Sequence, residues 1–355
     1  MTKKSLPALI LLLSALGLRA QTPEQSAGDS NAIFERTPKI SRGAGPLPAM
    51  DWNPTHAVFL SLPPETAQVL PRGRMRWETT WTQTNSMEGI KTQDGGNGLL
   101  HAETTRLTQV WRIGLGEGLE AGIQIPFIYR SRPWMDGLIG WVEETAAGEM
   151  SATRRRYQGD STTYEVNHPE FTVKDRVDQY GPGDIALIIK TLLVEETPHQ
   201  PALAVRVGVE LPTGSVTDGR GSGAVDVAVE LGLQKALTSW LNAYGNVSAT
   251  MPGNDSPYVR PFGGASFALE LLPRENISLT AQYSTFSSPY QDTNVKVLDG
   301  RDDLVLMGVN YKYPLSKNRK LTFRLFAAEN TFWRAPGEWA GSAADFTVGS
   351  GIFLE

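Results

Sequence analysis

The feature that most limits the fold of this chain is an alternation of apolar and polar residues that recurs along most of its length. In residues 203–211 (LAVRVGVEL) every odd-numbered position is Leu or Val, and the even-numbered positions are Ala, Arg, Gly and Glu. Residues 119–127 and 225–234 alternate in a similar way. Successive side chains of a β-strand point to opposite faces, so this period of two predicts strands with one apolar and one polar face.

The length of these segments favours a membrane protein. Strands of soluble proteins usually run about five or six residues, whereas a tilted strand that crosses a bilayer needs roughly nine to eleven. A closed barrel satisfies every backbone hydrogen bond, shows an apolar band to lipid and turns its polar face to the lumen. About twelve segments fit, most of them 9–14 residues long: 74–84, 102–114, 119–127, 183–194, 203–211, 225–234, 239–250, 259–271, 276–286, 303–313, 320–332 and 344–354.

The sequence therefore predicts an all-β fold, a transmembrane antiparallel β-barrel of about 12 strands over residues 71–355. A secreted β-sandwich is the alternative, because its strands also alternate. Aromatic residues near the segment ends, such as Trp111 and Trp240, favour the barrel, since Trp and Tyr gather at membrane–water interfaces.

Short and long connections alternate along the chain, as in a meandering outer-membrane barrel. Residues 114–118 and 273–275 are short connections, whereas 85–101 and 130–182 are long. Within the longest, apolar residues at helical spacing predict a short helix near 134–147. The Gly-rich stretch 212–223 lacks the Gly-Lys-Ser/Thr ending of a phosphate loop and precedes another alternating segment, so it is predicted to connect two strands.

The amino terminus indicates export. Lys3 and Lys4 precede an apolar run over residues 6–18, and the small residue Ala20 follows, so residues 1–20 are predicted to be a signal peptide. Its removal leaves 30 Lys and Arg against 38 Asp and Glu, a net charge of −8 that argues against nucleic acid as a partner. We expect the cell outer membrane as the location, with its lipids and lipopolysaccharide as partners. Residues 21–70 are expected either to plug the lumen or to lie in the periplasm.

Several short motifs carry a family resemblance. Residues 45–73 contain a Gly-Pro-Leu element, the pair Asn53–Pro54 and the ending Leu70–Gly73. Further motifs are MDGLI at 135–139, GPGDIALIIK at 181–190 and ELPTG at 210–214. By the order and spacing of these motifs, the chain resembles the uncharacterised outer-membrane family called domain of unknown function 3187. The resemblance implies an outer-membrane barrel and supplies no activity.

The sequence offers little for catalysis or metal binding. The absence of cysteine excludes thiolate chemistry, and none of the four histidines lies two residues from a serine, the spacing used by barrel phospholipases. His101 and Glu103 share one strand face and form the one pair that could orient a proton relay. We therefore predict no enzyme activity, no metal and no cofactor.

The polar faces of the segments are the better place to look for function. Charges of both signs lie on neighbouring segments, and they are expected to pair because an unpaired charge in a narrow barrel is costly. The candidate lumen-facing residues are Arg76, Glu78, Arg106, Arg112, Glu120, Lys190, Arg206, Glu210, Asp226, Glu230 and Arg324. Both a plugged, salt-bridged interior and a narrow channel fit this pattern.

Three functions are consistent with such a barrel. The first is a narrow channel or transporter for small solutes, with the solute unidentified. The second is a structural or adhesion barrel that does not transport and acts through outer loops 85–101 and 130–182. The third is a lipid-modifying enzyme, for which only His101 is placed near the rim.

Overall fold

The computed structural model describes residues 43–91, 97–150, 154–155, 163–168, 171–174, 179–293, 295–316, 319–330 and 344–355. Within them the strands form one sheet that closes on itself, because β1 (Met75–Lys91) pairs with both β2 (Asn97–Gly116) and β15 (Ala344–Leu354). The rest of the wall consists of β3 (Leu119–Ser131), β7 (Ile185–Val194), β8 (Ala202–Leu211), β9 (Asp226–Ala236), β10 (Leu241–Met251), β11 (Phe262–Arg274), β12 (Ile277–Phe286), β13 (Asp302–Ser316) and β14 (Arg319–Asn330).

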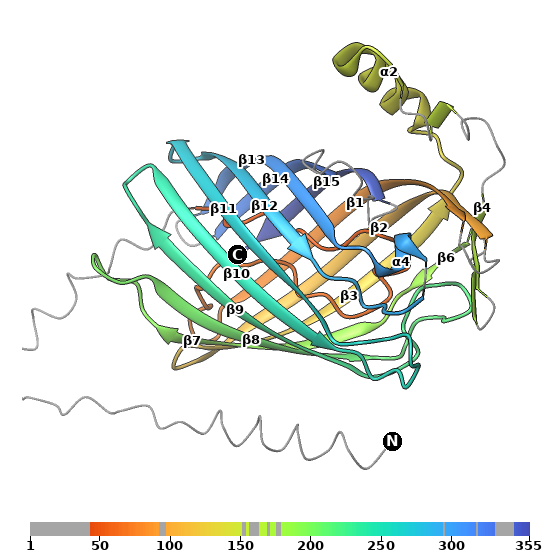
Figure 1. Ribbon diagram of the computed structural model, residues 1–355. Helices are drawn as coiled ribbons and strands as arrows, with labels where there is room; N and C mark the ends of the chain where they lie inside the picture. Colours follow the sequence, from red (N-terminus) through yellow and green to blue (C-terminus); the bar gives the residue numbers. More distant parts are fainter. Residues whose placement is uncertain are drawn as a thin grey trace, which may run out of the picture. The chain divides into compact units, whose positions relative to one another are not determined.

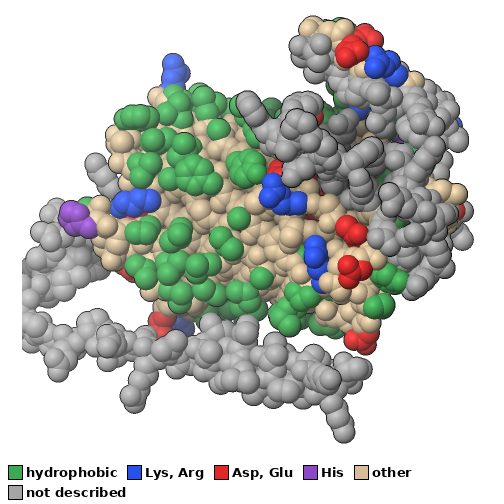
Figure 2. Space-filling view, in the orientation of Figure 1, with side chains coloured by type: hydrophobic (Ala, Val, Ile, Leu, Met, Phe, Trp, Pro, Cys, Tyr) green, Lys and Arg blue, Asp and Glu red, His purple; other side chains and the backbone are tan. Residues whose placement is uncertain are grey.

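Each of these twelve strands is antiparallel to its neighbours, which confirms the predicted twelve-stranded antiparallel barrel for the described part of the chain (Figure 1). Along β8 the small and charged residues are buried and the valines are partly exposed, so the polar face points into the lumen. Figure 2 shows hydrophobic side chains over most of the visible wall, with charged ones mainly toward its two ends. An apolar exterior of this kind suits contact with lipid.

The two ends of the barrel differ. At one, the short-turn end, the strands are joined by residues 117–118, 195–201, 237–240 and 275–276. The two-residue turn 117–118 has Glu117 and Gly118 at positive φ, 52° and 73°, a conformation that glycine adopts without strain. The longer connections gather at the opposite end, the long-loop end.

The prediction of a long outer loop over 85–101 is wrong for most of its length. β1 continues to Lys91 and β2 begins at Asn97, and these two residues are paired. Polar residues occupy both faces here, as in Asn85 and Ser86, which are both buried. The alternation therefore stops while the backbone pairing continues.

The connection between β3 and β7 contains the predicted helix, observed as α2 (Asp136–Ala147). It also contains three short strands that the sequence did not reveal. These are β4 (Thr163–His168), which pairs with the start of β2, β5 (Phe171–Lys174), which pairs with β4, and β6 (Gln179–Pro182), which pairs with β3. A second short helix, α4 (Lys296–Asp299), lies between β12 and β13. No helix among the described residues is long and apolar enough to span a membrane.

Residues 43–72, the inner segment, have irregular backbone and run inside the barrel. They start near the short-turn end, where the Ala44 amide donates to Glu270 at 2.6 Å. At the long-loop end His56 contacts the Leu298 carbonyl at 2.9 Å. The segment then returns, and the Leu70 amide donates to Glu120 at 2.8 Å. Residues 43–52 are therefore the outgoing limb and residues 60–72 the return limb, while residues 21–42 lie outside the described part.

Two glycines of the wall make room for the inner segment. A Cβ atom at Gly308 of β13 would lie 2.6 Å from Leu47 Cδ2 of the outgoing limb. A Cβ atom at Gly208 of β8 would lie 2.9 Å from Leu62 Cδ2 of the return limb. Each limb therefore approaches the wall more closely than a residue with a side chain would allow.

Candidate functional site

The lumen holds the charged residues that the sequence singles out. Ten of the eleven make a hydrogen bond or ion pair with one another, with the inner segment or with neighbouring wall residues. The remaining one, Glu210, is 4% exposed and lies opposite Asp226 in the pairing of β8 with β9. The Asp226 carboxylate accepts the amide of Leu60 at 3.3 Å.

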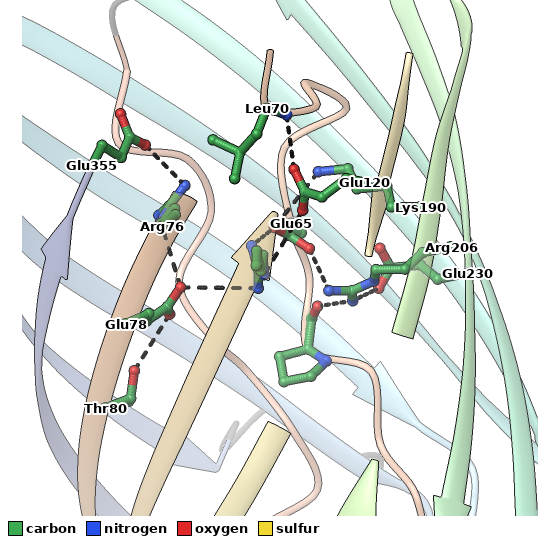
Figure 3. A network of polar contacts seen from close by, with 12 residues as sticks. Glu65, Leu70, Arg76, Glu78, Thr80, Glu120, Lys190, Arg206, Glu230 and Glu355 are labelled. Carbon is green, nitrogen blue, oxygen red and sulfur yellow. Dashed lines mark hydrogen bonds and ion pairs between the residues drawn. The ribbon is translucent and has the colours of Figure 1, made fainter. Parts of the chain in front are cut away.

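One carboxylate of the inner segment, Glu65, joins three cations of the wall (Figure 3). Its Oε2 accepts from Arg206 Nη1 at 2.5 Å, and its Oε1 lies 3.6 Å from Lys190 Nζ and also pairs with Arg112. Arg206 in turn donates to Glu230 of β9 at 2.7 Å. Sequence reasoning missed Glu65, because it belongs to a segment without any periodic pattern.

The ion pairs continue along β1 and β2 (Figure 3). Arg112 lies 3.9 Å from both Glu78 and Glu120. Arg76 lies 3.8 Å from Glu78 and 3.3 Å from the side chain of Glu355. The ion pairs from Glu230 on β9 to Glu355 at the end of β15 therefore form one connected network.

An aromatic ring lies between two of the lumen cations. Phe353 of β15 has the guanidinium carbon of Arg76 at 4.9 Å from its ring centre and that of Arg324 at 4.8 Å. Arg324 donates to Asn310 Oδ1 at 2.7 Å and to the carbonyl of Ala44 at 2.9 Å. The last aromatic residue of the chain thus points into the lumen, where it stabilises two cations through its ring face.

The outgoing limb is held mainly by apolar contacts. Trp52 stacks on Phe326 of β14 with ring centres 6.4 Å apart. The buried cluster around this pair consists of Leu47, Ala49, Met50, Trp52, Phe286, Leu304, Leu306, Phe326 and Ala328. Burial of this kind stabilises by roughly 25 cal/mol per Å² of apolar surface.

At the turn of the inner segment, Asp51 and His56 meet Ser288, which lies far from them in the sequence. Asp51 Oδ2 lies 2.6 Å from His56 Nδ1, and Ser288 Oγ lies 3.5 Å from His56 Nε2. His56 Nε2 is nearer to the Leu298 carbonyl, at 2.9 Å, and that carbonyl also accepts the Ser288 hydroxyl. The serine proton is thus directed to a backbone acceptor and not to the imidazole, and the group fastens the turn to the connection that contains α4.

His101 and Glu103, the candidate relay, bind the start of α2. His101 Nε2 lies 2.7 Å from Asp136 Oδ2, and Glu103 accepts the amide of Met135. Burial raises the pKa of the Asp136 carboxyl, but hydrogen bonds with His101 and Asn85 and the nearby charges outweigh burial and hold it below its usual value. The cluster therefore acts as an anchor for the helix. Among the described residues, no group of three or more His, Asp or Glu could hold a metal ion.

A small cavity remains between the two limbs and the wall. Its volume is about 80 Å³. Its walls come from both limbs, from β1 and β2, and from single residues of β3, β8, β14 and β15.

Comparison with known proteins places the chain in a family. A family model described as "Protein of unknown function (DUF3187)" matches residues 36–332. The chain belongs to the DUF3187 family. No curated protein matches the sequence of this DUF3187 protein.

Among solved structures, the DUF3187 protein has the fold of the COG4313 outer membrane channel from Pseudomonas putida F1. The TM-score is 0.52 at 12% identity, and the match covers 83% of this chain and 100% of that one. The NanC porin matches with a TM-score of 0.40 at 8% identity, over 79% of this chain and 98% of that one. The Pseudomonas putida toluene transporter TodX matches with a TM-score of 0.36 at 10% identity, over 87% of this chain and 97% of that one. The match to the COG4313 protein shows the fold alone, a closed outer-membrane β-barrel.

Proposed function

We propose that the protein is a narrow channel for small solutes in the cell outer membrane, and that the inner segment closes it. The proposal rests on the observation that the inner segment occupies the lumen. A separate piece of irregular chain, hydrogen-bonded to the wall, occupies the interior, so its displacement would leave a polar passage. Barrels of about eight strands are filled by their own side chains and those of sixteen or more hold water, so twelve strands leave a narrow lumen.

The orientation follows from the connections. Outer-membrane barrels keep short turns in the periplasm and longer loops outside. Both ends of the inner segment lie at the short-turn end, so the segment would enter from the periplasm and return to it. The plugged interior and the narrow channel then become two states of one protein.

The absence of native cysteine permits a direct test. In the double variant Leu62→Cys/Gly208→Cys, a disulfide would tie the return limb to β8, because Leu62 lies against Gly208. Single-channel conductance in planar bilayers is expected to be silent under oxidising conditions and to show steps after reduction. The two single-cysteine variants are the controls, and their conductance should not respond to the redox condition.

Two outcomes would count against the proposal. Steps that persist in the fully cross-linked variant would show that solutes do not need displacement of the return limb. If neither the native chain nor the reduced variant shows conductance steps at any voltage tested, the protein does not act as a channel.

A second candidate function is attachment through the long-loop end, favoured by α2. Its region exposes Trp134 at 63%, Leu138 at 53% and Trp141 at 62%, although the buried contacts of Asp136 fix its start. Exposed apolar groups on an anchored helix suit contact with another surface. If the protein works in this way, Trp134→Ser/Trp141→Ser should reduce adhesion of cells that display it and leave conductance unchanged.

A further inference from the structure

Glu65 of the return limb is the acidic partner of three cations that come from three separate strands. Arg112 belongs to β2, Lys190 to β7 and Arg206 to β8, and the closed barrel brings them to one place. Both carboxylate oxygens of Glu65 are used (Figure 3). Oε2 accepts from Arg206 at 2.5 Å, and Oε1 pairs with Arg112 and lies 3.6 Å from Lys190. We call these three wall residues the three-cation site.

The wall alone leaves the three-cation site incompletely paired. Among the described residues, Lys190 has one ion pair within 4.0 Å, and its partner is Glu65. Arg112 has two wall carboxylates nearby, those of Glu78 and Glu120, but each lies 3.9 Å away. The side chain of Lys190 is 4% exposed, and a buried charge that loses its partner is costly. Withdrawal of Glu65 therefore leaves a place for another carboxylate.

The surroundings of the site limit the charge that it takes. Glu230 stays 2.7 Å from Arg206 whether or not the return limb is present, because both residues belong to the wall. Glu78 and Glu120 stay beside Arg112 in the same way. Like charges repel more strongly in a narrow lumen than in water. The site therefore suits one singly charged carboxylate, as it holds that of Glu65, better than a multiply charged anion.

Glu65 reaches the site as a tethered group. Arg206 also donates to the carbonyl of Pro63, and Asn246 donates to the carbonyl of Glu65 at 2.9 Å, so the backbone holds the carboxylate in place. A group on a short tether acts as if it were present at about millimolar concentration. A free carboxylate at or above that concentration competes with it, and the return limb then loses its ion pairs.

We propose that the three-cation site binds the carboxylate of a small organic acid, and that Glu65 occupies the site while the lumen is closed. The solute then opens its own passage, because its binding replaces the ion pairs that hold the return limb. A ligand shifts an equilibrium only when it binds one state better, and here the site is vacant only after Glu65 has withdrawn. The inference rests on the proposed function, since it names the class of solute and the event that opens the channel.

Displacement of the return limb can be measured without conductance. The chain has no native cysteine and Leu62 is 4% exposed, so the thiol of a Leu62→Cys variant is protected while the limb is in place. Labelling by a neutral maleimide in detergent is followed in potassium chloride and in potassium acetate of the same ionic strength. Labelling should be at least about threefold faster in acetate, because acetate competes with the tethered carboxylate.

A neutral analogue tests the role of charge. Acetamide has nearly the shape of acetate, and it should leave the labelling rate unchanged when it is added to the chloride solution at the same concentration. Equal rates in chloride and acetate would overturn the proposed site. Equal acceleration by acetamide would show that charge plays no part and would overturn it as well.

Substitution of Glu65 shows whether acetate acts at this carboxylate. In Glu65→Gln/Leu62→Cys the acetate response should vanish, because no tethered carboxylate is left to displace. Glu275→Gln/Leu62→Cys, which removes an exposed carboxylate of a turn, is the matched control and should keep the response. A response that persists in Glu65→Gln/Leu62→Cys would mean that acetate acts elsewhere, and the assignment would fail.

Direct binding locates the site on the wall. Carbon NMR line broadening of isotope-labelled acetate should show at least about tenfold tighter binding to Glu65→Ala than to the native chain, because the tethered competitor is gone. Adding Lys190→Met should weaken that binding about tenfold, whereas adding Arg274→Gln, at an exposed arginine, should not change it. Equal affinity of the native chain and Glu65→Ala would overturn the proposal. The labelling of Leu62→Cys keeps every residue of the site, so it decides the question even if these variants do not fold.

The results separate the two proposals. Faster labelling in acetate without conductance steps would keep the three-cation site and contradict the channel. Conductance steps with equal labelling in chloride and acetate would keep the channel and overturn the site.

Discussion

Both limbs of the inner segment pack against apolar residues of the wall, and the return limb adds a cluster of ion pairs. On the outgoing limb, Leu47 and Trp52 pack in an apolar cluster with β12, β13 and β14. On the return limb, the carboxylate of Glu65 joins cations of β2, β7 and β8. Apolar contacts do not respond to ionic strength, whereas ion pairs at partly accessible sites weaken as salt is added. The return limb is therefore the part that ions or a charged solute can loosen.

The largest expected effect is on the apolar limb. Trp52→Ala should destabilise the closed state by about 4 kcal/mol, because it removes a buried ring that stacks on Phe326. The open probability in planar bilayers should rise equally in 0.1 M and 1 M KCl. Trp134→Ala, at an exposed tryptophan, is the control. A rise seen at only one salt concentration would contradict the apolar origin of this anchor.

The second effect concerns the ionic limb. Glu65→Gln leaves Arg112, Lys190 and Arg206 without their shared carboxylate, and loss of one partner from a buried ion pair costs about 3 kcal/mol. The variant should open more often than the native chain and should lose its response to salt. Glu275→Gln, at an exposed turn residue, should behave as the native chain. If Glu65→Gln keeps the salt response, ion pairs other than those of Glu65 must be responsible for it.

The third prediction compares how the two limbs respond to a larger side chain on the wall beside each of them. Gly308→Val should push against Leu47, and Gly208→Val against Leu62, each at a cost of about 2 kcal/mol. Limited proteolysis should then show faster cleavage of the limb that faces the changed glycine. Gly245→Val, where an added Cβ has only an ordinary contact at 3.9 Å, is the matched control. Uniform cleavage of both limbs in both variants would mean that they move as one body.

The smallest effect needs no mutation. Raising KCl from 0.1 M to 1 M shortens the screening length from about 10 Å to about 3 Å and should weaken the Glu65 network by about 1 kcal/mol. The open probability of the native chain should increase several-fold in bilayers. A decrease would indicate that lumen charges repel the inner segment more than they hold it.

The sequence predicted the wall well because each wall residue faces either the apolar outer surface or the polar lumen. Val205 and Val207 face outward and Arg206 inward, so the period of two carries the strand, its register and its lumen face together. The alternation ends at Asn85, because the successive residues Asn85, Ser86 and Met87 of β1 are all buried. The short strand β4 lies in that same region.

The inner segment was harder to predict for a physical reason. Irregular backbone has no periodicity, so nothing near Glu65 indicated that Arg112 and Arg206, 47 and 141 residues away, are its partners. His56 and Ser288 are 232 residues apart and meet only because two connections reach the same end of the barrel. Contacts of this kind depend on the closed barrel, and the residues themselves carry no local sign of them.

The shared entry and exit of the inner segment has a consequence for folding. Because Ala44 and Leu70 both lie toward the short-turn end, no part of the segment has to be threaded through the ring of strands. The wall closes by pairing β1 with β15, and that seam can form before or after the lumen is filled. The chain stays unknotted in either order, as nearly all chains do. The inner segment can therefore enter an already closed barrel from the short-turn end.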